Sequence, residues 1–194
     1  MTKKDITSRI FLFSGILKNI EITDDKGRPE RIDFAINRVL AIMNEAKRTN
    51  RSFFFVGNGG SAAIASHMVV DFVNACGIKA STFLDYSMLT CMGNDYGYQN
   101  IFAEPIRRAM EKGDVLVAIS SSGQSENILR SVTTAKSKGC TTITLSGFKK
   151  DNPLRKLGDI NFYVPSDSYR LVESAHDFII HQYFVDFFLE TQKN

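Results

Sequence analysis

Two short runs of glycine and serine give this chain the means to bind an anion. The first reads GNGGS from Gly57 to Ser61, and the second reads SSSGQS from Ser120 to Ser125. Each run follows an apolar segment and precedes a segment with helical spacing. Glycine permits a positive φ and a close backbone approach, and Asn58 or Ser61 can cap the helix that follows. The N–H groups that stay free in a helix's first turn, together with the helix dipole, attract an anion.

The hydroxyl content of these runs favours a phosphate monoester over a nucleotide. Four serine hydroxyls and free N–H groups suit the oxygens of a phosphate. The sequence has no GxxxxGK[ST] motif, and GNGGSA does not match GxGxxG with an acidic residue about 20 positions further on. One Ser/Gly run by itself is usually a turn with a capping serine. Two such runs after two strands of one sheet predict a phosphate site for a small molecule.

The elements that must position these runs are short apolar strands that alternate with helices. We predict strands over residues 53–56, 80–84, 115–119, 142–145 and 160–164. We predict helices over residues 61–75, 100–111, 125–138 and about 168–191. Fully apolar strands alternating with helices indicate a parallel sheet that is covered on both faces. Ligands of such sheets bind beyond the carboxyl ends of the strands, where both serine runs are expected.

The first fifty residues precede this alternation and predict a helical hairpin. Its helices cover residues 5–19 and about 28–49, with a turn over 24–29. We therefore expect a single α/β domain over residues 1–194, in which the N-terminal helices at about 5–49 form an appendage for oligomerisation.

Composition excludes several classes of protein. The chain of 194 residues is 43% hydrophobic and 23% charged, which is typical of a globular domain. A net charge of +3 without a basic run argues against nucleic acid, and no apolar run approaches the roughly 20 residues of a membrane span. The three cysteines form no CxxC pattern, which argues against disulfides and a cysteine zinc site. Asp5 and Arg9 interrupt the N-terminal apolar stretch, so we expect a cytoplasmic protein without a signal peptide.

Four motifs together resemble the sugar isomerase (SIS) domain, specifically its phosphoheptose isomerase branch. They are GNGGSAA followed by His67, then NDYGY, AISSSGQSENI and a late ExxHxxxxH. The resemblance runs over nearly the whole chain from about residue 30. It implies a three-layer α/β sandwich around a parallel sheet of about five strands, and a homotetramer with active sites at subunit interfaces. We expect those interfaces to bury three phenylalanines near the C-terminus: Phe184, Phe187 and Phe188.

The resemblance also implies an activity, the isomerisation of D-sedoheptulose 7-phosphate to D-glycero-D-manno-heptose 7-phosphate for bacterial surface heptose (lipopolysaccharide or capsule) synthesis. Such a reaction needs a carboxylate or histidine that moves a proton between neighbouring carbons, and a group that polarises the carbonyl. By the same resemblance, four serines hold the phosphate: Ser61, Ser120, Ser122 and Ser125. A second set contacts the substrate's remaining groups: Asn58, Gly59, Gly60, Asn94, Asp95 and Ser121.

Zinc is the cofactor that the resemblance implies, with four ligands at His67, Asp71, Glu173 and His181. Asp71, Glu173 and His181 are also the candidate catalytic groups. Asp71 replaces the family's Glu and Glu173 replaces its Gln; both keep an oxygen donor, and the site becomes one charge more negative. A tetrahedral set of four protein ligands leaves no position for the sugar, so we expect Asp71 to detach when substrate binds.

Two alternatives remain open at this point. Arg170 stands where the family commonly has an Asp, and it could pair with Glu173. The metal would then be absent, and isomerisation would proceed by acid–base chemistry alone. The second alternative is a non-catalytic SIS module that binds a phosphosugar or a protein partner such as a replication initiator. Retention of Asp71 and His181 argues against that loss of activity.

Overall fold

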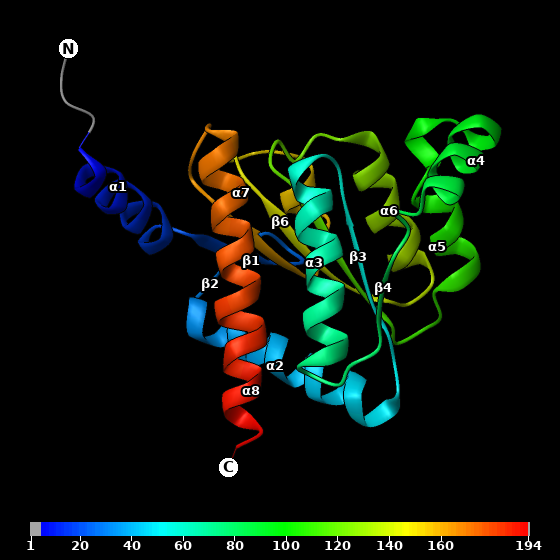
Figure 1. The fold of residues 1–194 in the computed structure, drawn as a ribbon, viewed down its shortest axis with the longest axis horizontal. Coiled ribbons are helices and arrows are strands. Elements are labelled where there is room, and N and C mark those ends of the chain that lie inside the picture. The colour runs from blue at the N-terminus through cyan, green and yellow to red at the C-terminus, as the bar shows by residue number, and fades with distance from the viewer. Residues whose placement is uncertain (1–4, 194) are drawn as a thin grey trace.

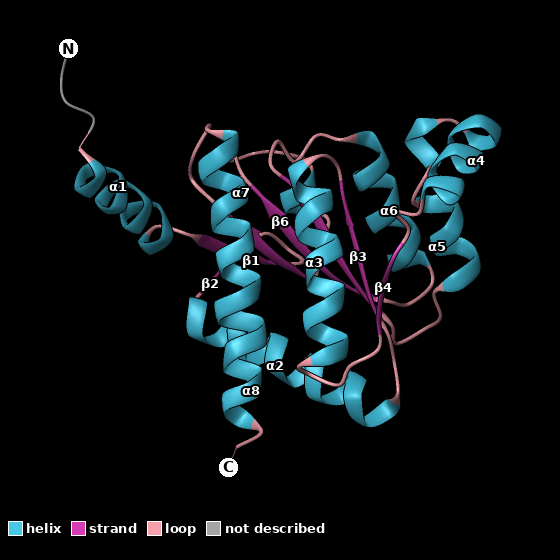
Figure 2. Ribbon diagram, in the orientation of Figure 1, coloured by secondary structure: helices cyan, strands magenta, loops and turns pink. Residues whose placement is uncertain are grey.

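The computed structural model describes residues 5–193 and centres on one sheet of seven strands. Figure 2 shows the strands in magenta between layers of helices. The strands are β1 (Glu21–Asp24), β2 (Pro29–Glu30), β3 (Phe53–Gly57), β4 (Ala80–Thr82), β5 (Val115–Ser120), β6 (Thr141–Ser146) and β7 (Ile160–Tyr163). Their order across the sheet is β2-β1-β7-β6-β5-β3-β4. The five strands from β7 to β4 are parallel, which confirms the predicted parallel sheet.

Helices cover both faces of this sheet, as predicted. They are α1 (Ile6–Lys18), α2 (Ile32–Thr49), α3 (Gly60–Asn74), α4 (Tyr86–Tyr96), α5 (Ala103–Ala109), α6 (Glu126–Ser137), α7 (Tyr169–Phe178) and α8 (Phe187–Thr191). A π-helical stretch, Ile179–Asp186, joins α7 to α8 into one long helix (Figure 1). Helix α4 was not predicted, and α5 is shorter than the helix expected over residues 100–111.

The three consecutive phenylalanines of β3 contribute to two hydrophobic cores, one on each face of the sheet. Phe53 and Phe55 pack with α2, α3 and the C-terminal helix, whereas Phe54 packs with α5 and α6 on the opposite face. Successive side chains of a strand point to opposite faces, so a strand buried on both sides must be apolar throughout. Helices α3 and α6 therefore lie on opposite faces of the sheet, and each begins just after a central strand.

The predicted N-terminal hairpin of two helices is wrong in one respect, because β1 and β2 lie between α1 and α2. Strand β1 pairs with β7 in antiparallel fashion over four residue pairs. Ile22 is buried there, and the Asp24 carboxylate accepts hydrogen bonds from the N–H groups of Lys26 and Arg28 to close the turn into β2. Strand β1 therefore covers the edge of β7. If the first fifty residues formed only two helices, the backbone groups along that edge would have no strand partner.

Helix α1 extends away from the rest of the molecule (Figure 1) and carries exposed apolar side chains. Ile6, Ile10 and Phe11 are 77%, 63% and 72% exposed. By contrast, Phe184 and Phe188 are fully buried in the chain's own core, so the prediction that they lie between subunits is wrong. Phe187 is 38% exposed, so of the three predicted phenylalanines it alone remains available to a partner, together with the apolar side chains of α1.

His176 is fully buried, and this makes the stability of the fold sensitive to acid. Its Nε2 lies 3.2 Å from the carbonyl oxygen of Ser146, and burial lowers the pKa of His176 to about 4. An unfolded histidine titrates near 6.5, so the contribution of neutral His176 is complete above that pH and is lost as the pH falls from about 6.5 to about 4. We expect a loss on the order of 3 kcal/mol in unfolding free energy from this residue. Urea unfolding of wild type and His176→Gln at pH 7, 5 and 4 checks it, and equal pH dependence in both proteins would contradict it.

Candidate active site

The two serine-containing loops meet at the carboxyl ends of β3 and β5 and enclose one cavity of about 220 Å³. These strands are hydrogen-bonded neighbours, which places the loops side by side. The lining comes from both loops and from the start of α7: Asn58, Gly59, Gly60, Ser61, Ser120, Ser121, Ser122, Ser125, Tyr169 and Glu173. All four serines expected to hold phosphate therefore line the same cavity.

The N-termini of α3 and α6 reach this cavity without side-chain caps. Gly59, with φ of +54°, precedes α3, and Ser125 precedes α6; neither Asn58 nor Ser61 supplies the cap that their position suggested. The third N–H of each helix already donates to a cap carbonyl, Ala62 to Gly59 and Ile128 to Ser125, so the N–H groups of the first two residues of each helix are left for a bound anion. The Ser121 hydroxyl is also buried and has no protein partner. A buried hydroxyl without a partner is rare in native proteins, and a ligand in this cavity would satisfy it.

Glu173 lies at the phosphate end of the site. Its carboxylate comes so close to Gly60 that a Cβ at position 60 would lie 2.5 Å from it. Glycine at this position therefore lets α7 approach the start of α3. Arg170 is exposed, and among residues 5–193 no ion pair within 4.0 Å joins it to Glu173. The alternative in which Arg170 neutralises Glu173 has no support in this arrangement.

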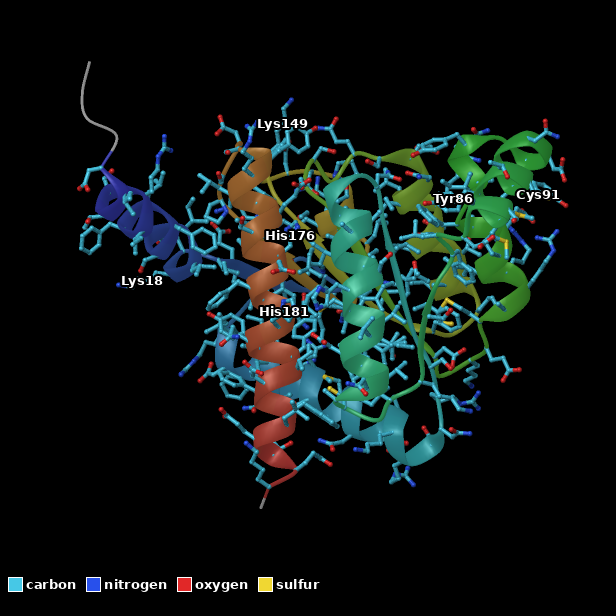
Figure 3. All side chains as sticks on the ribbon, in the orientation of Figure 1. Lys18, Tyr86, Cys91, Lys149, His176 and His181 are labelled. Carbon is cyan, nitrogen blue, oxygen red and sulfur yellow. The ribbon has the colours of Figure 1, made fainter. Side chains whose placement is uncertain are left out.

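A second group of polar side chains lies further along the same two helices. His67 and Asp71 project from α3, and His181 projects from the π-helical stretch; Figure 3 labels His181 on the long C-terminal helix. His181 Nε2 is 3.2 Å from Asp71 Oδ2, and His67 Nε2 is 3.9 Å from Asp71 Oδ1. One ligand atom from each of the three residues lies within 4.8 Å of the others. Glu173 is not part of this cluster, so the structure brings together three of the four expected ligands.

The donor set of this cluster suits a cation. His181 Nδ1 lies 3.1 Å from the carbonyl oxygen of Asp177 and 3.3 Å from its carboxylate, so a proton on Nδ1 is held there. The Nε2 lone pair then faces the Asp71 carboxylate, and two acceptors at this distance need a proton or a metal ion between them. Ligands of a tetrahedral zinc ion lie roughly 3.3 Å apart, a separation that the 3.2 Å between His181 and Asp71 matches and the 3.9 Å between His67 and Asp71 exceeds. Three protein ligands would leave the fourth position open to a substrate oxygen.

Asn94 and Asp95, expected to contact the sugar, lie outside both the cavity and the cluster. They are exposed on α4, and Asn94 Nδ2 donates to Asp95 Oδ1 at 2.9 Å. Tyr169 is a lining residue that the sequence did not reveal, because nothing in its neighbourhood distinguishes it from the chain's other tyrosines.

Replacing Ser122 by alanine is expected to weaken binding of a phosphorylated ligand. The substitution removes one hydrogen bond to a charged oxygen, worth roughly 1.5–3 kcal/mol, so KM should rise roughly ten- to hundredfold. Steady-state kinetics, with inorganic phosphate as a competing inhibitor, measures both effects. Ser137→Ala on the exposed end of α6 is the control. An unchanged KM in Ser122→Ala would remove Ser122 from the phosphate site.

The fold and this site define the class of the protein. The family model described as the SIS domain matches residues 29–147, more than half of the chain. The chain therefore belongs to the SIS domain family.

Full-length relatives narrow this class. The chain is 37% identical over 158 residues to the phosphoheptose isomerase of Nitratiruptor sp., covering 78% of this chain and 84% of that one. It is 34% identical over 172 residues to the phosphoheptose isomerase of Sulfurimonas denitrificans, covering 86% and 88%. The structure of a phosphoheptose isomerase from Francisella tularensis matches 98% of this chain and all of its own, with a TM-score of 0.81 and 27% identity. Within the SIS domain family, the chain is a member of the phosphoheptose isomerases and an isomerase enzyme.

Proposed function

We propose that the protein converts D-sedoheptulose 7-phosphate to D-glycero-D-manno-heptose 7-phosphate. The observation that carries this proposal is the pairing of two sites on the same two helices. A serine-lined cavity with two uncapped helix N-termini suits the phosphate, and the cluster of His67, Asp71 and His181 suits proton transfer. The name of the similar proteins, phosphoheptose isomerase, supports a heptose phosphate as the substrate. That the product enters bacterial surface heptose (lipopolysaccharide or capsule) synthesis is part of the proposal.

Asp71 is a better candidate than Glu173 for the group that transfers the proton between C1 and C2. It removes a proton from C1 of the open-chain ketose, the C1–H electrons form the C1=C2 bond of an enediol, and the C2 oxygen takes up a proton. Loss of the proton on the C1 oxygen then forms the aldehyde, and the carbon-bound proton returns at C2. His181 Nε2, 3.2 Å from Asp71, suits the proton transfer at the two oxygens when no metal ion is bound to that nitrogen, whereas with zinc bound it would hold the ion. Glu173 lies beside Gly60 at the phosphate end and takes no part in this step.

Zinc is the cofactor that the cluster fits, with His67, Asp71 and His181 as its ligands. Bound there, the ion would polarise the sugar carbonyl as a Lewis acid. Asp71 presents one carboxylate oxygen toward each histidine, so one oxygen can hold a cation while the other accepts a proton. Because Glu173 lies apart from the cluster, no protein ligand has to detach before the sugar binds.

A homotetramer is the assembly that we propose, with the N-terminal elements of a single domain over residues 1–194 as the oligomerisation appendage. The exposed Ile6, Ile10 and Phe11 of α1 support it, because a protruding helix with such a face is usually covered by a partner. We expect light scattering at micromolar concentration to give a mass about four times that of one chain. Phe11→Asp should shift this mass downward, and a monomeric wild type would contradict the proposal.

An isomerase assay on D-sedoheptulose 7-phosphate tests the proposed function directly. We expect turnover to the aldoheptose phosphate, detected by chromatography or a coupled enzyme. Binding of the sugar phosphate without turnover would instead indicate the non-catalytic SIS module, whether it serves as a sugar sensor or as a partner for another protein.

A further inference from the structure

Asn127 takes no part in the proposed chemistry, yet its side chain joins the two phosphate loops. It lies in the first turn of α6 and is only 2% exposed. Asn127 Nδ2 donates to Asn58 Oδ1, and Asn58 Nδ2 donates to Asn127 Oδ1, both at 2.9 Å. The hydroxyl of Tyr98 donates to the same Asn58 Oδ1 at 3.2 Å. Asn58 belongs to the loop before α3, so this amide pair connects the start of α3 to the start of α6.

Asn58 has little other support for its side chain. It lines the serine-containing cavity on one side and a second cavity of about 170 Å³ on the other. The second cavity is lined mainly by apolar side chains, among them Leu84, Leu89 and Phe102. A side chain between two cavities keeps its orientation only through its hydrogen bonds, and those bonds come from Asn127 and Tyr98.

The pairing determines which atoms Asn58 offers to a ligand. An asparagine amide has two N–H donors and an oxygen that accepts two hydrogen bonds. Here the oxygen accepts from Asn127 and from Tyr98, and one N–H donates to Asn127. Rotation of the Asn58 amide by half a turn would place its NH₂ group against that of Asn127. The arrangement therefore leaves one N–H of Asn58 for an oxygen in the cavity.

We propose that Asn127 is a positioning residue: it fixes the loop before α3 to the start of α6 and orients Asn58 as a donor to the phosphate of the bound phosphosugar, in the cavity that the four serines line. This inference rests on the proposed function for the identity of the ligand. It means that one contact to the ligand depends on Asn127, a buried residue that does not itself line the cavity.

A double-mutant cycle between Asn127→Leu and Asn58→Ala tests the proposal. We measure the Kd of inorganic phosphate by calorimetry, which needs no turnover, and then KM and kcat for the heptose phosphate. Each single variant should raise Kd and KM roughly tenfold, with kcat changed less than about threefold. The double variant should bind no more weakly than either single variant, because the two residues act as one unit. Effects that multiply to roughly a hundredfold, or an unchanged Kd in Asn127→Leu, would overturn the proposal.

Two further variants separate positioning from a general loss of stability. Ser131→Ala removes another buried hydrogen bond of α6, from its hydroxyl to the carbonyl oxygen of Ile128, and should lower the melting temperature without changing Kd. Tyr98→Phe removes one hydroxyl from a side chain that is 64% exposed, so it should fold even if Asn127→Leu does not. Its KM should rise roughly two- to tenfold, and an unchanged KM would overturn the proposal. Phosphate binding without turnover in the wild type would refute the proposed function and leave this cycle interpretable.

Discussion

Replacing Asp71 by asparagine is expected to lower kcat roughly a hundred- to ten-thousandfold, with little change in KM. The substitution keeps the shape of the side chain and removes the carboxylate that takes the carbon-bound proton. The phosphate site lies at the other end of the helix pair, so binding should persist. Steady-state kinetics measures the effect, and exchange of the C1 proton with solvent deuterium, followed by NMR, identifies the step that is lost.

Asp186→Asn provides the matched control for this substitution. Asp186 is an exposed carboxylate of the C-terminal helix that carries His181, and it lies outside the cluster. Its replacement should leave kcat and KM unchanged. Substantial kcat in Asp71→Asn would contradict the role of Asp71 and direct attention to Glu173 or His181.

Removal of metal is expected to produce a second large effect, a loss of activity of roughly a hundredfold or more that added zinc restores. A chelator-treated, dialysed sample should show this loss and still bind inorganic phosphate, because the serine-containing cavity is separate from the cluster. Metal analysis should find about one zinc per chain before treatment. Full activity in a metal-free preparation would contradict the zinc proposal and favour acid–base chemistry alone.

The zinc content of two variants identifies which residues bind the metal. His67→Ala should lower the zinc content and leave the phosphate Kd unchanged. Glu173→Gln should retain its zinc, because Glu173 lies beside Gly60 and outside the cluster. Loss of zinc in Glu173→Gln would show instead that Glu173 is a ligand, as the sequence pattern predicted.

The sequence was sufficient to predict the parallel sheet and the loops that follow its central strands. Runs such as residues 53–56 and 115–119 are short and apolar throughout, which is typical of strands buried on both faces. The serine and glycine runs after them determine where two helices begin. These patterns lie within short stretches of neighbouring residues, so they can be recognised without knowledge of the tertiary structure.

Other features depend on contacts that a sequence does not display. Strand β2 has two residues, and β1 is stabilised by pairing with β7, about 140 residues further along the chain. The π-helical stretch contains no glycine or proline from which it could be predicted. Such stretches often occur at functional sites. The position of Glu173 is a feature that the sequence did not predict. The resemblance placed it among the zinc ligands, whereas the structure places its carboxylate beside Gly60 and outside the cluster.

The placement of both halves of the site along α3 has a consequence for how related enzymes can change substrate. Ser61 and Asp71 are ten residues apart on this helix, a rise of roughly 15 Å, and a helix cannot stretch as a loop can. Moving the proton-transferring group closer to the phosphate means moving it by three or four residues, since smaller shifts turn the side chain away from the C-terminal helix. Each such step is about 5.4 Å, several carbon atoms of an open-chain sugar. The length of sugar accepted would then change in discrete increments of one helical turn, and a sugar one carbon shorter would have to be accommodated by bending or tilting of the substrate.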